Sequence, residues 1–99
     1  MKLMIIKDIR HMQKGLAVLT GPLLMENVVR RSDVEKAFGE KVFVVDRNGA
    51  STHLAVMDVS VNQTMAGSMQ VSLGVKMPPD NLGVALEGLV YSEDSPFPQ

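Results

Sequence analysis

The chain has 99 residues, of which 45% are hydrophobic and 21% charged, close to the averages for folded domains. We therefore expect one small domain rather than a disordered chain. The absence of cysteine excludes disulfides, thiolate metal sites and a cysteine nucleophile. A net charge of −1 argues against a dedicated nucleic-acid binder. No apolar run is long enough for a membrane span, and we expect no signal peptide, so cytoplasm is the default location.

The first half of the chain predicts two strands that flank a turn. We expect strands over residues 2–9 and 15–20, with the turn at 11–14. The pair Gly21-Pro22 ends the second strand, because this pair favours a turn.

One helix is predicted over residues 32–38. Ser32 and Glu35 have the spacing of a capping box, and Gly39 can end the helix in the left-handed conformation. A helix of about two turns is not stable alone, so we expect it to pack on a sheet.

The middle of the chain predicts a hairpin and a further strand. Residues 41–46 are apolar on both sides, which suits a central or covered strand with Phe43 in the core. The turn at Asn48-Gly49 joins this strand to residues 53–61, in which strict alternation places Met57 on the apolar face. Residues 69–75 alternate clearly and place Met69 on their apolar face.

Turns at 62–68 and 77–81 and a last strand over residues 82–91 complete the pattern. Two glycines in that last strand suggest a bulge or a barrel corner. The chain is thus expected to be mainly β: a small closed antiparallel β-barrel of six or seven strands with one short helix, because closure removes exposed edges. We expect the barrel to occupy residues 1–91 and a flexible tail to occupy residues 92–99.

Two segments resemble the second-domain β-barrel of elongation factor Tu and related translational GTPases. Residues 80–89 (Asp-Asn-Leu-Gly-Val-Ala-Leu-Glu-Gly-Leu) are similar to one strand of that domain, and residues 6–9 with 15–21 are similar to its first hairpin. The resemblance implies a barrel that docks on RNA or on neighbouring domains. It implies no nucleotide hydrolysis, since the phosphate loop of the family is absent here, and we expect no cofactor. Glu87 stands where the family has arginine, and residues 32–38 look like an insertion.

Acid–base chemistry has few candidate residues. Asp8 and His11, like His53 and Asp58, are separated by odd numbers of positions, so each pair should point to opposite faces of its strand. Neither pair forms a metal or catalytic site under this pattern, and we expect no bound metal. A small enzyme that uses Asp58 and His53 together with Asp46 remains an alternative, although an aspartate beside Asn48-Gly49 commonly serves the turn itself.

The charge is divided unevenly along the chain. Residues 1–50 carry a net charge of +3 and residues 51–99 a net charge of −4. The basic residues form two groups, Lys7, Arg10, His11 and Lys14 in one, and Arg30, Arg31 and Lys36 in the other. They suit contact with RNA or an acidic partner, an ordinary solvated face, or a contact between the basic and acidic halves of two subunits.

Methionine is unusually common, with eight residues. Some should fill the core, but Met65 and Met77 fall among turn residues, where flexible thioethers suit a surface that binds a partner. We therefore expect a non-enzymatic binding module that engages a protein partner or a second copy of itself through barrel edges and loops. An RNA- or ribosome-contacting barrel is an alternative. The candidate contact residues are Met65, Met77, Lys7, Arg10, Lys14, Arg30 and Arg31.

Overall fold

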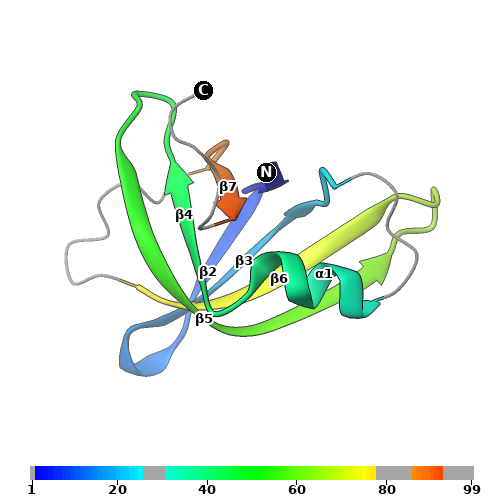
Figure 1. The fold of residues 1–99 in the computed structure, drawn as a ribbon, viewed down its shortest axis with the longest axis horizontal. Helices are drawn as coiled ribbons and strands as arrows, with labels where there is room; N and C mark the ends of the chain where they lie inside the picture. Colours follow the sequence, from blue (N-terminus) through cyan, green and yellow to red (C-terminus); the bar gives the residue numbers. More distant parts are fainter. Residues whose placement is uncertain (1, 26–30, 78–85, 93–99) are drawn as a thin grey trace.

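A computed structural model describes residues 2–25, 31–77 and 86–92 as one antiparallel sheet with a helix beside it (Figure 1). Seven strands within these residues follow the order β1-β7-β4-β5-β6-β3-β2. The expected mainly-β fold with one short helix is confirmed. The elements are β1 (Lys2–Ile5), β2 (Asp8–His11), the 3₁₀ turn η1 (Gln13–Gly15), β3 (Leu16–Pro22), α1 (Arg31–Phe38), β4 (Lys41–Val45), β5 (Ser51–Gln63), β6 (Met69–Lys76) and β7 (Leu89–Ser92).

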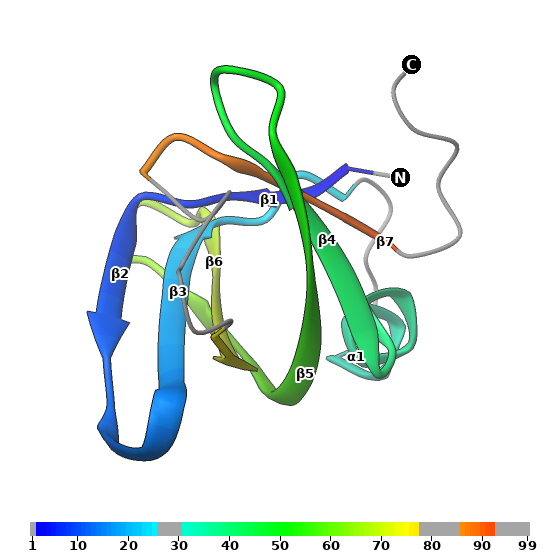
Figure 2. The ribbon, with the colours of Figure 1, turned by 90° about the vertical axis from the view of Figure 1, so that its left-hand side faces the viewer.

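The sheet curls into an open half-barrel, so the prediction of a closed barrel is wrong (Figure 2). The end strands, β1 and β2, have no ladder between them. The curled sheet meets itself instead where Met4 forms an isolated bridge with Leu23, and where the Leu24 N–H donates to the Leu3 carbonyl at 2.9 Å. This short seam holds β1 beside the end of β3 without completing the barrel.

The strand expected over residues 2–9 is divided into β1 and β2 because the chain changes neighbours between them. The Ile6 N–H donates to the Gly88 carbonyl at 2.9 Å, on the β7 side, whereas the Lys7 N–H donates to Thr20 of β3 at 2.8 Å. Gly21 allows the chain between β1 and β2 to lie close against β3. A Cβ atom at that position would collide with the carbonyl oxygen of Ile5.

The last strand is shorter than expected. Leu86 and Glu87 form a turn, in which Glu87 has a φ of 69°, and β7 begins at Leu89. Residues 82–85 of the expected strand lie outside the described residues. Ser92 is buried and belongs to β7, while the rest of the expected tail, residues 93–99, also lies outside them.

Helix α1 supplies two large side chains to the core. Val34 and Phe38 are fully buried in the same cluster as the inward residues of the strands, and α1 packs against β5 and β7. Gly39 ends the helix as expected, with a φ of 62° and a hydrogen bond from its N–H to the Glu35 carbonyl. Ser32 lies inside the helix, which begins at Arg31, so it is not the N-cap residue that the capping box predicted.

The core lies on the concave side of the half-barrel. Val42 and Val44 of β4 are fully buried there, and so are Leu73 and Val75 of β6. Phe43 is buried, as expected, but it lies between those two valines and points to the outer side of the sheet. It packs there against Tyr91 and His53 on the neighbouring strands.

Candidate functional site

Met65 and Met77, the methionines predicted to form a binding rim, lie apart. Met65 is fully exposed in the turn between β5 and β6, whereas Met77 follows the opposite end of β6 and is buried in the core. The prediction that Met77 contributes to a surface is therefore wrong. Proline residues after Met77 suggested a loop, but its own side chain packs inward.

The N-terminal basic residues do not form one patch. The Lys7 ammonium forms a salt bridge with Glu87, with Nζ–Oε distances of 2.8 and 2.9 Å, which neutralises its charge locally. Arg10 and His11 are adjacent in β2 and so point to opposite sides of the sheet. Lys14 is exposed in the 3₁₀ turn η1, where its φ is 61°.

The second basic group falls largely outside the described residues. Arg30 lies outside them, and only the backbone of Arg31 is described, as the first residue of α1. Lys36 is exposed on the same helix.

The residues of the alternative catalytic set occupy separate places. The Asp46 carboxylate accepts hydrogen bonds from the Asn48 and Ala50 N–H groups at 2.8 and 2.9 Å, so it serves the turn, as expected. The His53 ring packs against Phe43, with ring centroids 5.6 Å apart. Asp58 lies five positions further along β5. Within the described residues, no group of three or more His, Asp or Glu side chains could hold a metal ion.

A β-bulge in β5 changes which side chains reach the surface. The register between β5 and β6 shifts between Val56 and Asp58, and Met57 is the extra residue. Beyond the bulge, Val59 points into the core and Asp58 points outward. Met57 is 60% exposed, so its predicted place on the apolar face is wrong. The same shift puts Asp58 on the outer side with His53, contrary to the prediction from strict alternation.

The bulge borders a groove on the outer face of β3, β6 and β5. Val18, Gly74 and Asp58 lie opposite one another on these three strands. Because Gly74 has no side chain, the middle of this row is a depression. The groove has a volume of about 340 Å³.

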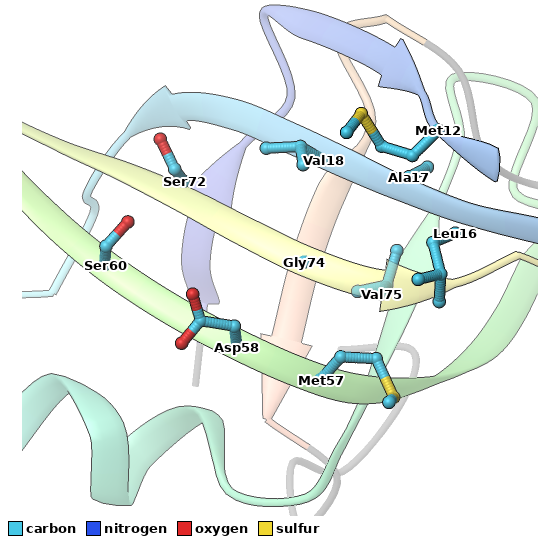
Figure 3. Close-up of a pocket in the computed structure, with 10 residues that line it drawn as sticks. All are labelled: Met12, Leu16, Ala17, Val18, Met57, Asp58, Ser60, Ser72, Gly74 and Val75. Atoms are coloured by element: carbon cyan, nitrogen blue, oxygen red, sulfur yellow. The ribbon is translucent and has the colours of Figure 1, made fainter.

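The two sides of the groove differ in chemistry (Figure 3). Met12, Leu16 and Met57 form an apolar side, and both thioethers are largely exposed, Met12 by 53%. The opposite side carries polar groups. They are the carboxylate of Asp58 and the hydroxyls of Ser60 and Ser72. The arrangement suits a bound segment in which an apolar side chain stands next to a cationic or hydrogen-bonding group.

A second hollow of about 370 Å³ lies next to this groove. It is bordered by Asp8, Arg10 and Thr20, and it shares Met12, Val18 and Ser72 with the first. Of the basic residues predicted to bind a partner, Arg10 borders this hollow, and Lys14 borders another one that shares Met12 and Leu16 with the groove. A bound segment that crosses β3 would contact both hollows.

Comparison with known proteins identifies no relative of this chain. No protein-family model, no curated protein and no solved structure matches it. Within the described residues, no helix has the length and apolar character needed to cross a membrane.

Proposed function

We propose that this protein is a non-enzymatic binding module, and that a protein partner inserts an apolar side chain into the groove over Gly74. The observation that carries the proposal is the pair of exposed thioethers, Met12 and Met57, on the apolar side of a groove whose middle is Gly74. Methionine side chains adjust their shape at little cost and are common at surfaces that accommodate varied apolar ligands.

The polar side of the groove limits the chemistry of the partner. Asp58 is exposed at its border, so it attracts a lysine or arginine next to the inserted apolar residue. Ser60 and Ser72 can donate to or accept from the backbone of the bound segment. The volume is large enough for one or two side chains, so the groove suits a short segment of a protein rather than a large cofactor.

A protein partner is favoured over RNA by the surroundings of the cations and aromatic rings. Lys7 is engaged by Glu87, and Arg10 and His11 face opposite sides of β2. Phe43 is only 3% exposed, so its ring face is not accessible for stacking on a base. Of the two segments that resemble elongation factor Tu, most of one, residues 80–85, lies outside the described residues. An RNA- or ribosome-contacting role therefore rests on the sequence resemblance alone.

A comparison of two methionine variants tests this proposal. Met57→Ser removes a thioether from the groove, and Met65→Ser removes an exposed thioether elsewhere, which makes it a matched control. Each tagged variant and the wild type are incubated with nuclease-treated lysate from cells that express the protein, and the retained proteins are identified. We expect one protein to be retained by the wild type and by Met65→Ser, and to be lost with Met57→Ser.

A groove-filling variant gives a second, independent measurement. Gly74→Leu fills the depression on the outer face of the sheet. The added Cβ would lie 3.6 Å or more from Asp58, an ordinary contact distance, so the backbone does not have to move. It should prevent binding while the fold is retained. Equal retention by all variants, or a retained component that disappears on nuclease treatment, would contradict the proposal.

A further inference from the structure

The outer strand β2 leaves one edge of the sheet unpaired. It pairs with β3 alone, and the described strands lie only on that side of it (Figure 2). The other end strand, β1, differs, because Met4 and Leu3 bond to residues 23 and 24 across the seam. Among the described strands, β2 is thus the edge open to another strand.

The hydrogen-bond pattern identifies which backbone groups of β2 point outward. The Met12 N–H donates to the Leu16 carbonyl at 2.7 Å, in the same register that places Arg10 opposite Val18. Because bonded positions alternate in an antiparallel ladder, Arg10 and Asp8 bond to β3. The N–H and C=O groups of Ile9 and His11 therefore point to the open edge.

The side chains of β2 select one partner for this edge. We propose that β2 pairs antiparallel with β2 of a second copy, in a register centred on Ile9. In that register Ile9 lies opposite Ile9 of the second copy, and Asp8 lies opposite Arg10 of the second copy. The two-fold symmetry repeats the contact, which gives two pairs of opposite charges on the outer face. The inference rests on the proposed binding function and assigns a second copy to one of its surfaces.

The competing register is unfavourable. Pairing centred on Arg10 would also align the free backbone groups, because Ile9 would then lie opposite His11 of the second copy. It would place two Arg10 guanidinium groups directly opposite each other, and like charges in this position destabilise a strand pair. Asp8 and Arg10 are both exposed, and neither has a salt bridge within the described part of the chain. Both charges are therefore available to the second copy.

The inner face of the pairing is apolar at its centre. Ile9 is partly buried and packs against the core cluster of its own subunit. Contact with Ile9 of the second copy would cover its remaining exposed surface. The paired edge is only four residues long, so we expect a weak dimer whose affinity falls as salt concentration rises.

Charge reversal provides the test. Asp8→Arg places like charges opposite each other in the dimer, and so does Arg10→Asp, so each variant alone should be monomeric. A mixture of the two restores both opposite-charge pairs and should form a heterodimer, and the double variant should dimerise like the wild type. Sedimentation equilibrium measures each affinity, and we expect each single variant to weaken self-association by at least about tenfold.

Hydrogen exchange adds a readout at the edge itself. The Ile9 amide should exchange more slowly as wild-type concentration rises, and should show no such change in Asp8→Arg. A wild type that stays monomeric, or self-association that persists in both single variants, would overturn the inference. Met57→Ser should leave dimerisation unchanged. Failure of the edge pairing is therefore distinguishable from failure of the groove, which is judged by retention of a partner.

Discussion

Replacement of Gly21 by alanine should disrupt the seam that holds the half-barrel together. The added Cβ would occupy the position of the Ile5 carbonyl oxygen, and would lie 3.2 Å from the Lys7 nitrogen. Both neighbours are backbone atoms, so no rotation of a side chain can relieve the collision. The segment between β1 and β2 must therefore move away from β3.

The cost of that movement follows from the contacts that it breaks. The Lys7 N–H to Thr20 and Leu24 N–H to Leu3 hydrogen bonds are lost or stretched, at about 1 kcal/mol each. Partial exposure of Leu3 and Met4, which are fully buried, adds about 1–3 kcal/mol. The total is roughly 3–5 kcal/mol, which lowers the thermal midpoint of a domain this size by at least about 12 °C.

Gly74→Ala is the matched control for this prediction. Gly74 also lies in a central stretch of the sheet, but a Cβ there would meet Asp58 atoms at ordinary distances of 3.6–3.7 Å. We expect a change within about 1 kcal/mol, because alanine restricts the unfolded chain more than glycine does. Urea denaturation followed by far-ultraviolet circular dichroism measures both free energies. A Gly21→Ala midpoint equal to that of Gly74→Ala would refute the close approach of Gly21 to the Ile5 carbonyl.

Two other substitutions test the core and the hairpin turn. Met77→Ser should lower the free energy of unfolding by about 2–4 kcal/mol, because it removes a buried side chain. Met65→Ser, the exposed control, should change it by less than about 0.5 kcal/mol. Equal urea midpoints for the two variants would show that Met77 lies on the surface. Asp46→Ala should cost about 1 kcal/mol, since the Asn48 and Ala50 N–H groups lose their acceptor. Thermal unfolding of Asp46→Ala and Asp46→Asn measures this loss, and an unchanged midpoint in Asp46→Ala would show that the turn does not depend on the carboxylate.

Local sequence patterns predict most of the strands because each depends on side chains near in sequence. Alternation identified β6, and the apolar segment at residues 41–46 identified β4 as a covered strand. Gly39 and the Asn48-Gly49 turn were also predicted correctly. These features follow from backbone conformations that few residue types adopt.

The groove could not be predicted because it depends on a register shift and on three strands distant in sequence. Strict alternation through β5 placed Met57 on the core face, and it placed Asp58 on the face opposite to that of His53. The bulge reverses both assignments. To predict the floor of the groove, one must know that Gly74 lies between Val18 and Asp58 on neighbouring strands. A glycine within the alternating strand was the one local signal of this depression.

The prediction of a closed barrel rested on the removal of exposed edges, and it treated residues 2–9 as one strand. The structure divides these residues into β1 and β2. The change of neighbours between Ile6 and Lys7 is determined by Gly88 and Thr20, which lie far along the chain. The close approach at Gly21 is likewise visible only in three dimensions.

We propose that the groove lined by Met12 and Met57 receives the protein partner. The most direct measurement is an NMR titration of the protein, labelled with ¹³C at its methionine methyl groups, with the protein recovered in the nuclease-treated capture. We predict that the methyl signals of Met12 and Met57 shift, while that of Met65 does not. Shifts at Met65 alone, or none at Met12 and Met57 on binding, would show that the partner does not bind in the groove.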